Sequence, residues 1–122
     1  MRISLKSWMM KYRIEVLKTF KREFKRLYKR YPSLRADIEN LREQILEDPN
    51  LGTDLGGGLR KIRMRISSKG RGKSGGARVI TFTVVLSVDE SEIDLVYIYD
   101  KAERESVSDS ELMELLRKSG LK

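Results

Sequence analysis

Residues 59–66, with the sequence LRKIRMRI, decide the fold, because apolar and cationic side chains alternate along them. Successive side chains of an extended strand point to opposite faces of its sheet. The apolar side chains of one face are Ile62, Met64 and Ile66. The cations of the other face are Lys61, Arg63 and Arg65. The pattern therefore predicts a strand with one buried face and one strongly cationic face.

The chain before this strand predicts another strand and two helices. Residues 12–17 alternate weakly and predict a first strand, and aromatic and leucine side chains then recur at helical spacing up to Tyr31. Pro32 ends that helix, and Ser33 can cap a second helix that ends before Pro49. The two helices are expected to pair as an antiparallel hairpin. The glycine-rich residues 50–58 are expected to form a loop.

The second half predicts two more strands, at residues 78–88 and 93–101, and a terminal helix. Ser108 and Glu111 have the spacing of a capping box at the start of that helix. Thr81 and Thr83 alternate with apolar residues and are expected on the open face of the sheet. The expected fold is α+β: an antiparallel sheet of about four strands, with an N-terminal helical hairpin on one face and a C-terminal helix.

Length and composition narrow the function classes. The 122 residues suffice for one domain, residues 1–122, in which residues 1–11 are an N-terminal extension. There is no cysteine to form disulfides or thiolate metal sites, and no histidine to act as a general acid or base near neutral pH. No apolar stretch resembles a signal peptide or a membrane span. A cytoplasmic location without membrane contact is expected.

The net charge of +8 is concentrated in two basic blocks. Residues 1–31 carry 11 basic and 2 acidic side chains, and residues 51–80 carry 8 and 1. The first block fits a solvated helix face as well as it fits a binding surface. The second block surrounds glycine-rich loops, and its most natural partner is a polyanion such as RNA or DNA.

The loop KGRGKSGG, residues 69–76, contains the Gly-Lys-Ser of a phosphate-binding loop. The full motif requires a glycine where Ser67 stands, and a helix must follow it, whereas β-forming residues follow here. A nucleotide-hydrolysing site is therefore rejected. The cations Lys69, Arg71 and Lys73 are instead expected to extend the positive surface of the sheet.

Four acids, Asp89, Glu90, Glu92 and Asp94, form a second cluster. They lack the spacing of a calcium loop, so a solubilising turn over residues 89–92 is favoured over a metal site. No metal and no cofactor are expected.

The open face of the sheet is expected to place Tyr97 and Tyr99 beside the cations. Such a face suits single-stranded nucleic acid, because cations follow the phosphates while aromatic rings stack on unpaired bases. A solvated antiparallel face has a similar composition and is the alternative interpretation.

Three segments, residues 58–63, 67–80 and 98–104, resemble the RelE/HigB branch of the RelE/ParE toxin superfamily. The order of expected elements fits that family over residues 12–117. The resemblance implies a type II toxin that cleaves mRNA, usually in the ribosomal A site. It also implies a cognate antitoxin, of the helix-turn-helix, HigA-like kind, that silences the toxin.

The resemblance also implies roles for single residues. Lys61 and Arg63 match the basic pair around the scissile phosphate, Arg78 matches an arginine that stabilises charge, and Lys101 falls where further functional residues cluster. Ala102 and Ser108 stand where relatives carry an arginine and a tyrosine. The general acid is therefore left open among Arg104, Tyr97 and Tyr99.

The chemistry of RNA cleavage agrees with this inventory. Attack by the 2′-hydroxyl needs a base, stabilisation of a dianionic phosphorane and protonation of the leaving 5′-oxygen, and no metal is obligatory. The neighbouring arginines favour a neutral amine on Lys61, which makes it the candidate base, while Arg63 and Arg78 stabilise charge. The alternatives are a non-catalytic ParE-like toxin that acts on DNA gyrase, and an inactive member that retains only antitoxin binding.

Overall fold

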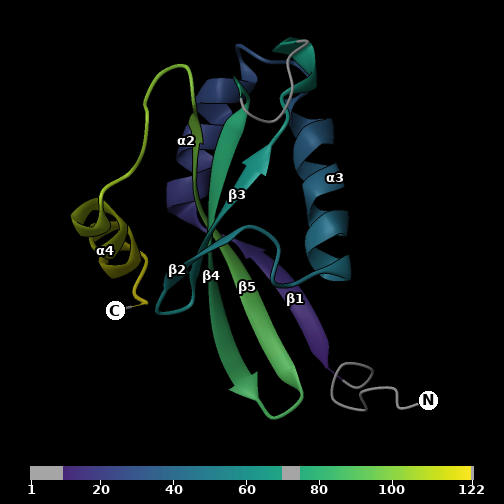
Figure 1. Ribbon diagram of the computed structural model, residues 1–122, viewed down its shortest axis with the longest axis vertical. Coiled ribbons are helices and arrows are strands. Elements are labelled where there is room, and N and C mark those ends of the chain that lie inside the picture. The colour runs from purple at the N-terminus through teal and green to yellow at the C-terminus, as the bar shows by residue number, and fades with distance from the viewer. Residues whose placement is uncertain (1–9, 70–74, 122) are drawn as a thin grey trace.

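The computed structural model describes residues 10–69 and 75–121 of the chain (Figure 1). Its first half runs β1 (Lys11–Val16), α2 (Lys18–Tyr28), α3 (Leu34–Glu47), β2 (Thr53–Gly56) and β3 (Leu59–Met64). A short 3₁₀ turn, η1 (Ser67–Lys69), precedes β4 (Ala77–Ser87), β5 (Glu90–Asp100) and α4 (Asp109–Lys118).

The sheet is mixed and has five strands in the order β1-β5-β4-β3-β2. Strand β1 runs parallel to β5, with Ile14 opposite Ile93, and the other pairs are antiparallel. The expectation of about four antiparallel strands is thus corrected in two places. Alternation within one strand does not specify the direction of its neighbour, so the parallel pairing of β1 could not be predicted.

Strand β2 is the second correction, because it lies within the glycine-rich segment that was expected to be a loop. Thr53 and Asp54 pair with β3, and Gly56, Gly57 and Gly58 then have φ values of 90°, 62° and 92°. Glycine adopts this left-handed conformation at little cost, so Gly57 and Gly58 form the tight turn between β2 and β3.

Helices α2 and α3 cover one face of the sheet, as predicted. Phe20, Leu27, Ile38 and Ile45 pack there with Ile62 and other strand residues in one hydrophobic cluster. The helix that begins at Ser108 is also confirmed, because its side chain accepts from the Glu111 amide and the reciprocal contact completes the capping box.

The opposite face of the sheet is not open as expected, since α4 packs against it. Figure 1 shows α4 on the other side of the sheet from α3. Leu112 and Leu116 of α4 pack against Ile80, Phe82 and Tyr99 in a second cluster. Thr81, expected on the open face, pairs with Leu95 and is buried with an exposed fraction of 2%. Both faces of β4 are covered, so the side chains on each of its faces are largely apolar. The alternation of β4 therefore does not show which face meets α2 and α3.

Candidate functional site

The strand register brings three predicted site residues into one row across the sheet. Arg63 lies opposite Arg78, and Arg78 lies opposite Tyr99. Residues directly opposite in antiparallel strands share a face, so the three side chains lie together on the face that carries α4. We call them the arginine–tyrosine row. The next row contains Lys61, Ile80 and Tyr97.

The row lies partly beneath the protein surface. Arg63 is exposed, whereas Arg78 and Tyr99 have exposed fractions of only 6% and 2%. Lys61 and Tyr97 are half-buried. The guanidinium of Arg78 donates to the carbonyl of Ala77 at 3.2 Å. The site is therefore a shallow cationic surface beside α4, with buried groups at its base.

The hydroxyl of Tyr99 is buried and has no hydrogen-bond partner within the described residues. Burial raises the pKa of Tyr99, and the positive charges of Arg78 and Arg104 oppose that shift. The phenol is accordingly protonated near neutral pH. It is a donor without an acceptor, which a bound anionic oxygen could supply.

Arg104 links the row to α4. Its guanidinium donates to both carboxylate oxygens of Glu111 at 2.8 Å and lies 5.8 Å from the ring of Tyr99. Hydrogen bonding to Glu111 raises the pKa of Arg104. Since Glu111 also caps α4, Arg104 holds the beginning of this helix against Tyr99.

Lys101 lies just beyond β5 and is engaged within the protein. Its ammonium donates to the Glu105 carboxylate at 2.8 Å and to the Glu105 carbonyl at 2.9 Å. Lys101, and more weakly the charge of Arg78, lower the pKa of Glu105. Sequence reasoning did not single out Glu105, although its four-residue spacing from Lys101 was a signal for the ion pair.

Lys69 is likewise engaged, in a buried group that we call the Asp100 cluster: Tyr31, Lys69 and Asp100. The Lys69 ammonium lies 2.6 Å from a carboxylate oxygen of Asp100, and Tyr31 donates to the other oxygen at 2.6 Å. Burial opposes ionisation of Asp100, but the hydrogen bonds from Lys69, Tyr31 and the Ala102 amide lower its pKa. The cluster fixes the entry to the glycine-rich loop against the end of β5.

The remaining predicted residues lie apart from the row or outside the described structure. Arg65 follows the end of β3 and lines a cavity of about 150 Å³ beside α3, together with Asp37 and Ser67. Arg71 and Lys73 lie outside the described residues. The residues after the loop form β4 and not a helix, which confirms that the Gly-Lys-Ser motif does not begin a phosphate-binding helix.

The acidic cluster was expected to form a turn over residues 89–92, but most of it lies in a strand. The hairpin turn lies at Val88 and Asp89, while Glu90, Glu92 and Asp94 belong to β5. Among the described residues, no group of three or more acidic, histidine or cysteine side chains is arranged to hold a metal ion. Within the same ranges, no helix has the length and apolar character needed to cross a membrane.

Comparison with known proteins identifies the family. The family model described as "RelE toxin of RelE / RelB toxin-antitoxin system" matches residues 12–120, a range that leaves out only Lys11 among the residues of the described strands and helices. No curated protein matches the chain. The matched range contains the arginine–tyrosine row and both helical layers. The chain therefore belongs to the RelE toxin family, whose members are toxins that pair with an antitoxin.

Proposed function

We propose that this toxin is an endoribonuclease that cleaves mRNA on the ribosome. The observation that carries the proposal is the arginine–tyrosine row, in which Arg63, Arg78 and Tyr99 lie side by side on one face. Two guanidinium groups suit the oxygens of a phosphate, and a buried phenol beside them supplies a proton donor. RNA carries its own nucleophile, so these groups suffice for the chemistry.

Each group has one role in this proposal. Lys61 accepts the proton of the 2′-hydroxyl as its oxygen attacks phosphorus. Arg63 and Arg78 stabilise the dianionic phosphorane, where preorganised charge has its largest effect. The bond to the 5′-oxygen then breaks, and Tyr99 gives that oxygen a proton, which leaves a 2′,3′-cyclic phosphate. The raised pKa of Tyr99 keeps the proton available near neutral pH.

The other predicted site residues take different roles in this proposal, according to the contacts that they make. Tyr97 is half-buried with its ring centroid 6.3 Å from that of Tyr99, so it can stack on a base beside the scissile phosphate. Arg65, Arg71 and Lys73 remain predicted RNA contacts. Lys101, which was predicted among the catalytic residues, is a positioning residue in this proposal because Glu105 engages its charge. Lys69 and Arg104 are positioning residues in this proposal, because their charges are engaged by Asp100 and Glu111.

Dependence on the ribosome follows from the small size of the site. Of the three cations in the two rows, Arg78 is buried, Lys61 is half-buried and Arg63 is exposed. Such a surface holds free RNA weakly, whereas the ribosome presents mRNA in a fixed position. The antitoxin partner of the helix-turn-helix, HigA-like kind belongs to the same proposal.

The test is induction of the toxin in cells, followed by mapping of mRNA ends. Wild type should arrest growth and cut translated mRNA, but not the same mRNA without a start codon. Lys61→Ala and Arg63→Ala should lower cleavage by about a hundredfold or more. Arg22→Ala, an exposed cation on α2, is the control and should behave as wild type. Growth arrest with intact mRNA and inhibited gyrase would replace this proposal with the ParE-like alternative.

A further inference from the structure

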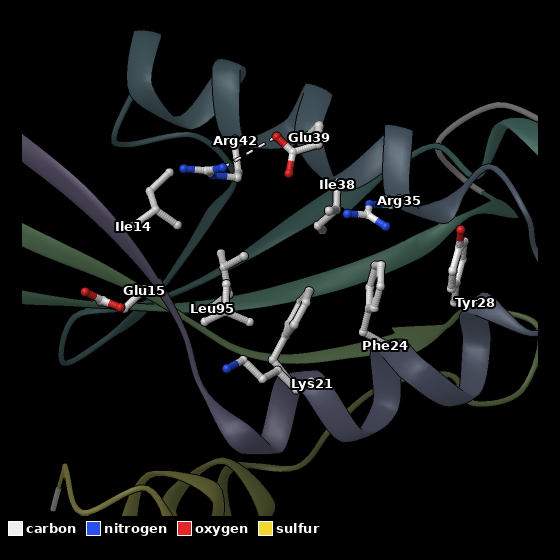
Figure 2. Close-up of a pocket in the computed structure, with 12 residues that line it drawn as sticks. Ile14, Glu15, Lys21, Phe24, Tyr28, Arg35, Ile38, Glu39, Arg42 and Leu95 are labelled. Carbon is white, nitrogen blue, oxygen red and sulfur yellow. Dashed lines mark hydrogen bonds and ion pairs between the residues drawn. The ribbon is translucent and has the colours of Figure 1, made fainter.

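Helix α3 borders two different hollows of the protein surface, one on each of its sides. The side that faces α2 carries Arg35, Ile38 and Glu39, which line a groove of about 550 Å³ (Figure 2). The other side carries Asn40 and Gln44, which line the smaller cavity of about 150 Å³ at the end of β3. This smaller cavity is a separate site, and we call it the α3–β3 pocket.

The α3–β3 pocket combines apolar and polar lining. Leu41 of α3 and Met64 of β3 are buried, with exposed fractions of 2% and 4%, and supply its apolar surface. Asn40 and Gln44 lie one helical turn apart and supply two carboxamides. Neither carboxamide has a hydrogen-bond partner within the described residues. Two planar polar groups are thus available to a ligand beside an apolar surface.

One wall of the pocket is held in place by hydrogen bonds within the protein. Asp37 has an exposed fraction of 9% and accepts from the hydroxyls of Ser33 at 2.7 Å and Ser67 at 2.6 Å. The Ser67 amide also donates to Asp37, at 3.0 Å. The negative charge of this carboxylate disfavours an anion inside the pocket. A neutral ligand that has several hydrogen-bonding groups is therefore favoured.

A cation borders the same pocket. Arg65 is exposed, and its guanidinium has no hydrogen bond or ion pair within the part of the chain that the structure describes. An anionic group outside the pocket can therefore bind Arg65 while a neutral group of the same ligand lies inside. The pocket is smaller than the range of about 300–1,000 Å³ that holds drug-sized ligands. It thus suits one flat ring system better than a whole nucleotide.

The α3–β3 pocket lies within reach of the arginine–tyrosine row. Arg65 follows Arg63 by two residues, so their backbones are at most about 7 Å apart. Strand β2 pairs only with residues 59–61 of β3, so no described strand covers the outer edge of residues 62–64. An RNA strand can pass over this edge, with one phosphate at the row and a neighbouring phosphate at Arg65.

We propose that the α3–β3 pocket holds an unpaired base of the substrate RNA, next to the bond that is cut. The inference rests on the proposed function, because it takes the RNA at the arginine–tyrosine row as given. Asn40 and Gln44 hydrogen-bond the edge of the base, as carboxamides do in other complexes with nucleic acids. Leu41 and Met64 contact the face of the base, and Arg65 binds its phosphate. The pocket thereby makes cleavage depend on the base beside the cut.

The first arm of the test measures binding to isolated Arg63→Ala toxin, in which the row binds phosphate less well. NMR follows the carboxamides of the chain, Asn40, Gln44 and Asn50, during titration with the 5′-monophosphates of adenosine, cytidine, guanosine and uridine. At least one monophosphate should shift the Asn40 and Gln44 signals but not that of Asn50, which is exposed outside the pocket. Ribose 5-phosphate, which lacks the base, should bind about tenfold or more weakly.

Matched variants show whether the carboxamides hold the base. Asn40→Ala/Gln44→Ala should weaken binding of the preferred monophosphate by about tenfold or more. Asn50→Ala removes a carboxamide outside the pocket and should stay within about twofold of the parent. Asn40→Ala alone, at an exposed position, replaces the double variant if circular dichroism shows that the latter is unfolded.

The second arm identifies RNA, and not a free nucleotide, as the ligand. Cleavage sites on programmed ribosomes are mapped for wild type, the double variant and Asn50→Ala. Wild type and Asn50→Ala should prefer one base beside the cut, the same base whose monophosphate binds best. The double variant should cleave that sequence about tenfold more slowly but cleave the other sequences at the wild-type rate. A purely structural role would slow cleavage of all sequences alike.

The results that overturn this inference differ from those that overturn the proposed function. Equal binding of ribose 5-phosphate, or unchanged binding by the double variant, would exclude the pocket as a base site. Base binding with an unchanged cleavage pattern would assign the pocket to a free nucleotide and overturn the proposal. In these cases mRNA cleavage that depends on Arg63 would still stand. A wild-type toxin that cleaves no mRNA would refute the proposed function and, with it, RNA as the ligand.

Discussion

Replacement of Asp94 by asparagine should stabilise the folded protein, and the gain should be clearly larger at pH 8 than at pH 5. Asp94 lies in β5 with an exposed fraction of 0%, and neither carboxylate oxygen has a hydrogen-bond partner within the described residues. Glu15 lies opposite it in β1, and Glu92 precedes it by two residues on the same face. Ionisation of Asp94 would therefore place a buried charge beside two other acids.

The expected size follows from the pKa of this carboxyl. Burial, and then the adjacent Glu92 carboxylate, raise the pKa of Asp94 from 3.8 to about 7. The folded protein keeps the proton up to that pH, whereas the unfolded chain releases it near pH 4. Stability therefore falls as pH rises from about 4 to about 7, by at most about 4 kcal/mol. Because Glu92 carries the charge of the pair, with a lowered pKa, we expect a gain of about 2 kcal/mol from Asp94→Asn at pH 8.

Urea unfolding at pH 5 and pH 8 measures this difference directly. Asp89→Asn is the control, because Asp89 is exposed in the hairpin turn and its replacement should change stability by less than about 0.5 kcal/mol at either pH. A gain of equal size at both pH values, or no gain at pH 8, would refute the reasoning.

Three further predictions concern the site and the segments that position it. Tyr99→Phe removes a buried hydroxyl without a partner in the described residues, so urea unfolding should show little loss of stability while single-turnover cleavage slows by about a hundredfold or more. Asp100→Asn breaks the buried ion pair with Lys69 and should lower the free energy of unfolding by about 3 kcal/mol. Gly76→Ala would place a methyl group against the Met64 carbonyl oxygen, and thermal unfolding should show stability lowered by about 1–3 kcal/mol. Gly120→Ala is the control, because its methyl group meets open space and only the smaller cost of the positive φ remains.

The elements that the sequence predicted correctly are those specified by local chemistry. The alternation in residues 59–64 predicted that Ile62 and Met64 are buried and that Arg63 is exposed, and the structure confirms this. The start of α4 was predicted correctly from Ser108 and Glu111, because a capping box involves only residues close in sequence. Pro32 separated the two N-terminal helices as expected.

The features that could not be predicted depend on contacts between distant segments. Lys69 was predicted to contact RNA, yet it is held by Asp100, which lies 31 positions away in the sequence. Asp94 was predicted as one of four acids around a solubilising turn, yet the pairing of β5 with β1 and β4 buries it. Tyr99 was expected on an open face, yet it packs with Leu112 and Leu116 of α4. This contact depends on tertiary packing, which the pattern of one strand does not specify.

The measurement closest to the central claim is the single-turnover rate of mRNA cleavage on programmed ribosomes, compared between wild type, Arg63→Ala and Arg22→Ala. Both variants remove one exposed arginine, but only Arg63 lies in the arginine–tyrosine row. The account predicts a rate lowered by about a hundredfold or more for Arg63→Ala and an unchanged rate for Arg22→Ala. Cleavage by Arg63→Ala at the wild-type rate would contradict the assignment of this row as the site of RNA cleavage.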